Sequence, residues 1–336
     1  MIYEEWDALK SLNEISEHYD INNENWISIL WNNENLVFEA SNQIVRLSSS
    51  THRSKSEIDW EMKLLNILWN TKCSVVEIIL SRDGKSNIEI ELSWNPTHVV
   101  VFKKAPWSIK NLEDFWDQEV CLTQEWWRSM WEIHRNTAQN FEILHSLERL
   151  KWDEETIIAS ANKLLPSEEW EILNGLTLLV NEIKTLPTWP NDFGLVHTDM
   201  RPRNFHVDGS DIIHFDFDDI CYHWYIYDIA VSLLHEAEAK NSTIERTQFI
   251  IDFLQNFMKW YSEANTINPE IFIHIIDFMK LRLYYAYIDY YKRLAIKWVN
   301  SWSEKMLIRK WYIQDFETFI DTDMIQKEIF SLIKIN

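Results

Sequence analysis

The sequence is short of glycine: its 336 residues include four glycines, against 19 tryptophans. Average glycine usage of about 7% predicts roughly 23 glycines in a chain of this length, a number that the glycines and tryptophans reach together. We therefore hypothesise that many of the tryptophans are glycine in the natural protein, because a UGA codon that the source organism reads as glycine is translated here as tryptophan. The alternative is a lineage that prefers tryptophan, and the codons at these positions distinguish the two.

Cysteines and long apolar runs are also scarce. The three cysteines, Cys73, Cys121 and Cys221, are widely spaced and form no C-x-x-C pair. This pattern favours reduced thiols and argues against a disulfide framework or a zinc site. No stretch reaches the ~18 apolar residues of a spanning helix, and the N-terminal MIYEEWDALK lacks the basic and apolar regions of a signal peptide. We expect a cytoplasmic protein without a membrane partner.

Basic residues are outnumbered by acidic ones, 32 against 53, which gives a net charge of −21. A field of this sign repels nucleic acid and anionic membranes, and it attracts a cationic small molecule. The alternative is that the excess charge only keeps the protein soluble. The composition therefore predicts no nucleic-acid partner and leaves the oligomeric state open.

Short β-rich segments separated by turns fill the first third of the chain. One segment of helical spacing, 3–17, precedes them, and a second, 54–69, lies among them. The expected strands are 26–30, 35–40, 43–47, 74–80, 87–93 and 98–103. From about residue 108 we expect helices at 109–117, 121–138, 152–164, 167–185, 224–239, 244–262, 269–296 and, in pieces, 303–333. The sequence thus predicts an α+β fold with a β-rich N-terminal lobe (residues 1–104), a mostly helical C-terminal lobe (residues 105–336) and a ligand site where the lobes meet.

The segment from Phe193 to Ala230, FGLVHTDMRPRNFHVDGSDIIHFDFDDICYHWYIYDIA, has a recognisable chemical pattern. Asp199 and Asn204 lie five residues apart in a loop, and a hairpin around an Asp-Gly turn should return Asp216 to the neighbourhood of Asn204. Two carboxylates and a carboxamide at one place suit phosphoryl transfer. A carboxylate orients the attacking hydroxyl, and oxygen ligands hold Mg²⁺ against the nucleotide phosphates.

This segment resembles the catalytic segment of the aminoglycoside phosphotransferase and choline kinase superfamily, small-molecule kinases with a two-lobed, protein-kinase-like fold. The family pattern H-x-D-x-x-x-x-N is met by His197, Asp199 and Asn204, and its metal-binding aspartate by Asp216. The resemblance implies Asp199 as catalytic base, Asn204 and Asp216 as Mg²⁺ ligands, and His197 as a support for the loop. Asp228, in Tyr-Asp-Ile-Ala, is similar to a family aspartate that braces this loop. The alternative is a polar loop of capping side chains.

The resemblance also assigns residues of the nucleotide lobe, and the implied cofactors are ATP and Mg²⁺. Arg46 falls at the family's phosphate-binding lysine, and Glu61, in competition with Glu57, at the helix glutamate that orients it. Trp31 lies in the loop expected to cover the phosphates. The main chain from Val101 through Lys103 is expected to contact the adenine.

Several tryptophans stand where the resemblance leads us to expect glycine. They are Trp31, Trp107, Trp131 and Trp260, whereas Trp224 follows His223 as in similar proteins. A tryptophan in the phosphate loop would keep the backbone from approaching the nucleotide closely.

We therefore expect an ATP-dependent phosphotransferase that transfers the γ-phosphate to a hydroxyl of a small, amine-bearing molecule, such as an aminoglycoside, choline or homoserine. Thr198 stands where typical protein kinases have arginine, which favours a small-molecule kinase over a regulated protein kinase. The candidate acceptor residues are Asp218, Tyr222 and Glu236, together with His223, Tyr284, Tyr285, Tyr287, Asp289, Tyr290 and Tyr291.

Three other functions remain open on the residue types. A bacterial stress-type protein Ser/Thr kinase would share the same catalytic centre. A non-catalytic nucleotide-binding module would not need the complete set of Asp199, Asn204 and Asp216. A metal hydrolase could use the histidines and aspartates of this segment, although His206 and His214 lack metal-motif spacing.

Overall fold

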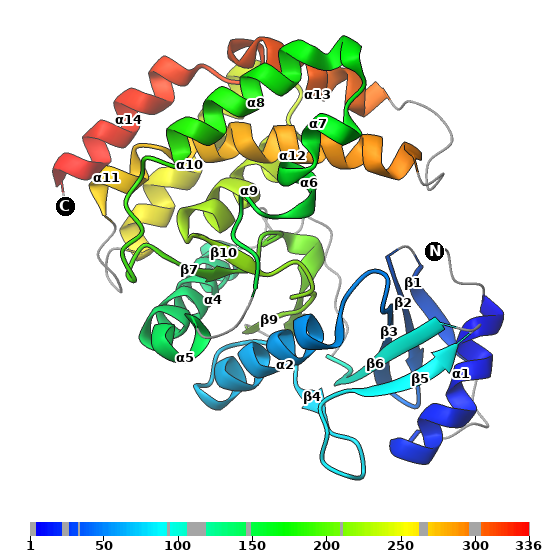
Figure 1. Cartoon of the computed structure of the whole chain (residues 1–336). Coiled ribbons are helices and arrows are strands. Elements are labelled where there is room, and N and C mark those ends of the chain that lie inside the picture. Colours follow the sequence, from blue (N-terminus) through cyan, green and yellow to red (C-terminus); the bar gives the residue numbers. More distant parts are fainter. Residues whose placement is uncertain are drawn as a thin grey trace. The chain divides into compact units, whose positions relative to one another are not determined.

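The computed structural model describes residues 5–21, 27–32, 34–92, 95–105, 119–145, 149–208, 211–261, 268–295 and 304–335. It forms two compact units, each described by itself below (Figure 1). The first contains Met1–Phe115, Leu147–Arg149 and Phe205–Asp218, and the second contains Trp116–Ser146, Leu150–Asn204 and Asp219–Asn336. The predicted α+β class is confirmed, because the first unit is built on antiparallel sheet and the second is mostly helical. The boundary between residues 104 and 105 stays a proposal.

An antiparallel sheet forms the body of the first unit. Its strand order is β1-β2-β3-β6-β4, and β5 also pairs with β6. The strands are β1 (Ser28–Asn32), β2 (Asn35–Ala40), β3 (Gln43–Ser49), β4 (Ile78–Ile79), β5 (Ile88–Leu92) and β6 (Asn95–Lys103). The expected strand at 74–80 is reduced to β4, because Val75 and the N–H of Val76 pair with His214 instead.

Two helices and a hairpin complete the first unit. Helix α1 (Glu5–His18) buries Leu12 and Ile15 in the same core cluster as strand residues of the sheet. Helix α2 (Lys55–Asn70) begins at a capping box formed by Ser54 and Glu57, a local signal that fixes its first turn. The hairpin pairs β8 (Phe205–Asp208) with β9 (Asp211–His214), as the Asp-Gly turn predicts, and the turn residue Gly209 lies outside the described residues.

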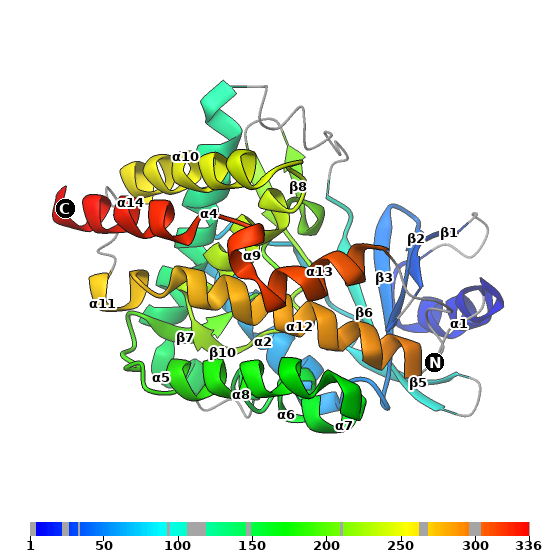
Figure 2. The ribbon, with the colours of Figure 1, turned by 90° about the horizontal axis from the view of Figure 1, so that it is seen from above.

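Helices make up most of the second unit, and Figure 2 shows α12 (Ile275–Ala295) flanked by α8 (Trp170–Ile183) and α13 (Glu304–Gln314). The remaining α-helices are α4 (Glu119–Gln139), α5 (Phe141–His145), α6 (Thr156–Ala159), α7 (Ala161–Leu164), α9 (Ile226–Ala237), α10 (Thr243–Tyr261), α11 (Pro269–Phe272) and α14 (Thr322–Ile335). The expected helix at 152–164 is broken into α6 and α7 at Ser160, and the one expected at 109–117 lies outside the described residues.

One short antiparallel pair interrupts the helices of the second unit. β7 (Phe193–Val196) pairs with β10 (Cys221–Trp224), and it delivers the chain to His197. No helix in the part of the chain that the structure describes combines the length and apolar character needed to cross a membrane.

Candidate active site

One buried carboxylate holds the loop that follows β7. Asp228, in the first turn of α9, is fully buried and accepts hydrogen bonds from the backbone N–H of His197 at 3.0 Å and of Thr198 at 2.7 Å. Nε2 of His134, in α4, lies 3.0 Å from the same carboxylate. Thr198 has a φ of +71°, which β-branched residues rarely adopt, so its conformation needs outside support. This is the geometry that a brace of the catalytic loop requires.

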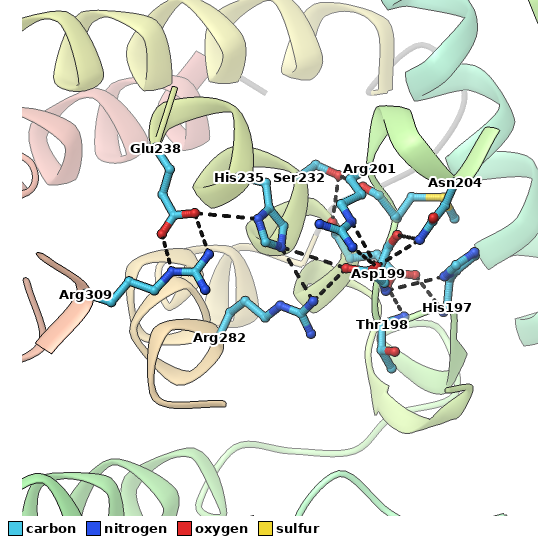
Figure 3. Close-up of polar contacts among 12 residues, drawn as sticks. His197, Thr198, Asp199, Arg201, Asn204, Ser232, His235, Glu238, Arg282 and Arg309 are labelled. Carbon is cyan, nitrogen blue, oxygen red and sulfur yellow. Dashed lines mark hydrogen bonds and ion pairs between the residues drawn. The ribbon is translucent and has the colours of Figure 1, made fainter. Parts of the chain in front are cut away.

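Donors from several segments surround the carboxylate of Asp199 (Figure 3). Nδ2 of Asn204 donates to both the backbone oxygen and Oδ2 of Asp199, each at 2.9 Å. Arg201 contacts the same Oδ2 through Nε at 2.9 Å and Nη2 at 2.8 Å. Arg282, in α12, donates from Nη2 to Oδ1 at 2.6 Å. His197 accepts the N–H of Asp199 on its Nδ1 at 3.3 Å, so it contacts the backbone of the loop.

The arginines keep Asp199 ionised. Burial alone would raise the pKa of this carboxyl, but the charges of Arg282 and Arg201 outweigh burial and lower the pKa to about 2. At neutral pH the side chain is therefore a carboxylate that only accepts hydrogen bonds. Such a group can orient an attacking hydroxyl and receive its proton.

Asp216 follows the β8–β9 hairpin of the first unit. Phe205, which comes directly after Asn204 in the chain, is paired with His214, two residues before Asp216. Asp216 is exposed and has a φ of +66°. Non-glycine residues with positive φ are uncommon, and they concentrate at functional sites.

A buried ion pair joins two of the residues expected in the nucleotide lobe. Arg46, in β3, is 4% exposed, and Glu61, in α2, is 1% exposed. Two parallel hydrogen bonds link them, from Nη1 to Oε1 at 2.8 Å and from Nη2 to Oε2 at 2.5 Å. Glu57 instead caps α2 at Ser54, so Glu61 is the partner of Arg46. Nε of Arg46 is buried and has no hydrogen-bond partner within the described part of the chain.

Asp218 lies in a second buried cluster of the first unit. Its carboxylate contacts Nδ2 of Asn35 at 3.0 Å, Nε2 of His52 at 3.0 Å and Nε of Arg53 at 3.2 Å, and its backbone oxygen accepts from Arg149 at 3.0 Å. Burial would raise the pKa of Asp218, but Arg53 and the hydrogen bond from His52 hold it well below its ordinary value. These contacts give Asp218 a structural role in its own unit and no support to the acceptor role expected from the sequence.

A small pocket, partly open to solvent, lies within the second unit beside Thr198. Thr198, which precedes Asp199 in the chain, and Arg282, which binds its carboxylate, both line it. Its wall combines aromatic rings with the carboxylates of Glu155 and Asp219. The complete lining is Trp152, Glu155, Ile158, Thr198, Asp219, Cys221, His223, Tyr227, Leu281, Arg282 and Tyr285.

Two of the predicted acceptor residues, His223 and Tyr285, thus lie in this pocket, whereas Tyr222 and Glu236 are not part of its lining. Tyr222 and Glu236 are buried, and the hydroxyl of Tyr222 donates to the backbone oxygen of Leu144. The sequence did not reveal that Trp152, Glu155 and Arg282 line this pocket, because none of them belongs to a local motif.

The residues expected to contact the nucleotide base and phosphates are placed as follows. Trp31 is 57% exposed in β1, next to an irregularity in the pairing of β1 with β2. Val101 is paired on both sides, with Val45 and Ile79, and Lys103 is the last residue of β6. Contacts of these residues with a nucleotide stay a prediction.

No described tryptophan has a positive φ, so the backbone at Trp31, Trp131 and Trp260 does not require glycine. Nε1 of Trp131 is buried and has no hydrogen-bond partner among described atoms, whereas Nε1 of Trp224 donates to the oxygen of Pro187 at 2.8 Å. Trp107 lies outside the described residues, as does the side chain of Trp260.

Residues 27–262 match the phosphotransferase enzyme family, APH. The chain belongs to this family. The predicted resemblance is therefore confirmed, and the protein is a phosphotransferase of the small-molecule kinase type.

Individual proteins agree with this membership. Amicoumacin kinase of Bacillus subtilis (strain 168) is 29% identical over 281 residues, which cover 82% of each chain. A solved structure of an amicoumacin kinase in complex with AMP-PNP, Ca²⁺ and Ami has a TM-score of 0.82 at 24% identity, covering 96% of this chain and 97% of that one. A microcompartment-associated aminopropanol kinase has a TM-score of 0.67 at 19% identity, covering 91% and 93%. These structures support the protein-kinase-like fold.

Proposed function

We propose that the protein transfers the γ-phosphate of ATP to a hydroxyl of a small, amine-bearing molecule. The observation that carries this proposal is the fixed carboxylate of Asp199. It lies between Thr198 and Arg282, which also line the pocket of the second unit. In this role Asp199 orients the acceptor hydroxyl and takes its proton.

The residues present fit a nucleotide with a divalent metal. Both N–H groups of the Asn204 carboxamide are used on Asp199, so its Oδ1 is the atom available to a cation. Together with the Asp216 carboxylate it would supply the oxygen ligands that Mg²⁺ prefers. Among the described residues, no three His, Cys, Asp or Glu side chains gather at a metal-sized site, so we propose this smaller protein ligand set. Mg²⁺, when bound, neutralises charge on the phosphates.

Arg46 is the residue that would contact the nucleotide phosphates in the first unit. Glu61 occupies its two Nη atoms, which fixes the guanidinium plane. The buried Nε has no partner in the described structure, and a phosphate oxygen would satisfy it. The name of the related amicoumacin kinase structure, which includes AMP-PNP and Ca²⁺, also supports a nucleotide and a divalent cation.

The pocket lining supports an acceptor that carries an ammonium group. Glu155 and Asp219 supply negative charge, and Trp152, Tyr227 and Tyr285 supply aromatic faces that attract cations. Two relatives are named for amine-bearing acceptors, amicoumacin and aminopropanol. A small molecule of this kind is the acceptor class that the lining favours.

An acceptor series tests the proposal. The purified protein is given ATP and Mg²⁺ with 1-amino-2-propanol, ethanolamine, choline, homoserine, an amino sugar or amicoumacin, and phosphorylated products are identified by mass spectrometry. Each amine is paired with its uncharged hydroxyl analogue. We expect phosphorylation of an amine and a higher KM for its neutral analogue. Glu155→Gln should raise the KM for the amine, and Glu154→Gln, the exposed neighbour, should not. Failure to phosphorylate any compound of the series would contradict the proposed acceptor class.

A further inference from the structure

The carboxylate of Asp199 is held from two sides by unrelated parts of the second unit. Its Oδ2 is bound by Arg201 and Asn204, which belong to the same loop, and Asn204 is part of the local sequence pattern. Its Oδ1 is bound by Arg282 at 2.6 Å, from a helix 83 residues further along the chain, and lies 3.8 Å from Nε2 of His235. Because Oδ1 is the oxygen that the loop itself does not hold, the orientation of the carboxylate depends on Arg282.

The guanidinium of Arg282 is itself fixed. Arg282 is 8% exposed, and its Cζ lies 5.0 Å from the ring centroid of Tyr285, one turn further along α12. Nε2 of His235, at the end of α9, is 3.5 Å from Nη2 of Arg282 and 3.8 Å from Oδ1 of Asp199. Arg282 is therefore held by contacts with its own helix and with α9.

A further ion pair continues this arrangement away from the loop (Figure 3). Nδ1 of His235 lies 3.8 Å from Glu238, and Glu238 binds Arg309 of α13 through two hydrogen bonds of 2.6 Å each. The side chains from Asp199 to Arg309 thus form one continuous polar network among α9, α12 and α13. Nε of Arg282 is buried within this network and has no hydrogen-bond partner among the described residues.

We propose that Arg282 is a positioning residue for phosphoryl transfer: it fixes Oδ1 of Asp199 and leaves the second lone pair of that oxygen for the acceptor hydroxyl. The inference rests on the proposed function, because it assumes that Asp199 receives the hydroxyl proton. Removing one partner of a buried ion pair also lowers stability, so kcat of the folded variant distinguishes the two roles: a small misplacement of a catalytic group costs about 10²-fold in rate.

Arg282 also lines the pocket, so it is placed to act at the moment of acceptor binding. An acceptor hydroxyl that approaches Oδ1 must share this oxygen with the guanidinium. Because Nη2 of Arg282 stays bound to Oδ1, it limits the directions from which the hydroxyl can donate to this oxygen. The expected consequence of removing Arg282 is a slower chemical step with substrate binding largely retained.

The test compares variants of two arginines on the same helix. Arg282→Met, Arg282→Lys and Arg282→Ala are measured beside Arg293→Met, whose arginine pairs only with Asp289 one turn away in the described contacts. Steady-state kinetics use ATP, Mg²⁺ and the compound of the acceptor series that the wild type phosphorylates fastest. We expect kcat of Arg282→Met to fall by about 10²-fold, KM for the acceptor to change little, Arg282→Lys to lie between, and Arg293→Met to match the wild type.

Chemical rescue separates positioning from folding. Guanidinium ion at low, non-denaturing concentration should restore part of the kcat of Arg282→Ala, and NaCl at equal ionic strength should not. The inference is overturned if Arg282→Met keeps the wild-type kcat. It is also overturned if the loss of kcat matches the fraction of unfolded protein measured by circular dichroism and guanidinium restores none of the lost kcat. Failure of the proposed function looks different, because then the wild type phosphorylates no compound or Asp199→Asn is as active as the wild type.

Discussion

Replacing Arg46 by methionine removes one member of the buried ion pair and leaves the other charged and without its partner. Glu61 is 1% exposed and loses two short hydrogen bonds at once. Breaking a buried pair in this way costs about 3–5 kcal/mol of unfolding free energy, since the remaining charge cannot be hydrated. The double variant Arg46→Met/Glu61→Leu removes both charges and fills similar volume, so it should recover most of this loss.

Arg46→Met and Glu61→Leu should lower the unfolding free energy by different amounts. Arg46 is also attracted by Asp218 and Asp216, which together with Glu61 keep its pKa raised in spite of burial. Glu61→Leu therefore leaves Arg46 with other negative charges nearby, and it should cost less than Arg46→Met. The free energies of unfolding come from urea titrations followed by circular dichroism, with the slope of the transition as a check on two-state behaviour.

The reasoning would be refuted by an Arg46→Met variant that loses less than about 1 kcal/mol, or by a double variant whose loss is the sum of the single ones. The same double variant separates the two roles assigned to Arg46. If Arg46 also contacts the nucleotide phosphates, the double variant is stable and still defective in ATP binding. Wild-type ATP affinity in a folded double variant would remove Arg46 from the nucleotide site.

Three further predictions follow from the loop, the Asp218 cluster and the tryptophans. Asp228→Ala leaves the N–H groups of His197 and Thr198 without their acceptor. The unfolding free energy should therefore fall by about 1–3 kcal/mol for each lost hydrogen bond, and kcat should fall as well. A variant with unchanged kcat would show that the loop does not depend on Asp228. The pKa of Asp218 is depressed in the folded protein, so its contribution to stability is complete above its ordinary pKa and is lost as pH falls through the depressed pKa. Asp218→Asn should therefore make stability fall less steeply in acid, as measured by urea titrations from neutral pH downward. An unchanged dependence of stability on pH would contradict this role of Asp218. Codon inspection and the intact mass of protein from its source organism test the tryptophan hypothesis, which fails if Trp31, Trp107, Trp131 and Trp260 are encoded by UGG.

Much of the fold could be predicted because its signals are local. The Asp-Gly turn specifies the β8–β9 hairpin, and Ser54 with Glu57 specifies the start of α2. The strand expected at 74–80 was too long, since pairing of Val75 with His214 depends on a partner more than a hundred residues away. Local propensity carries no information about such a partner.

The residues of the candidate site also fall into those that a local pattern predicts and those that only the fold brings together. The pattern of His197, Asp199 and Asn204 lies within one loop, and together with the hairpin, Asp216 and Asp228 it carried the resemblance to the family. Arg282 reaches Asp199 across 83 residues, and Asp218 meets Asn35 across 183. No spacing rule connects such residues, and only the folded chain reveals that Asp218 belongs to a buried cluster and that Arg282 belongs beside the carboxylate.

The most direct test of the central claim is the rate of acceptor phosphorylation by Asp199→Asn, measured beside Asp323→Asn, an exposed aspartate at the start of α14. Phosphorylated product is quantified by mass spectrometry under conditions in which both variants are folded and bind ATP. If Asp199 receives the hydroxyl proton, its variant is slower by about 10²- to 10⁴-fold and the control is unchanged. Wild-type turnover by Asp199→Asn would contradict the assignment of the catalytic base.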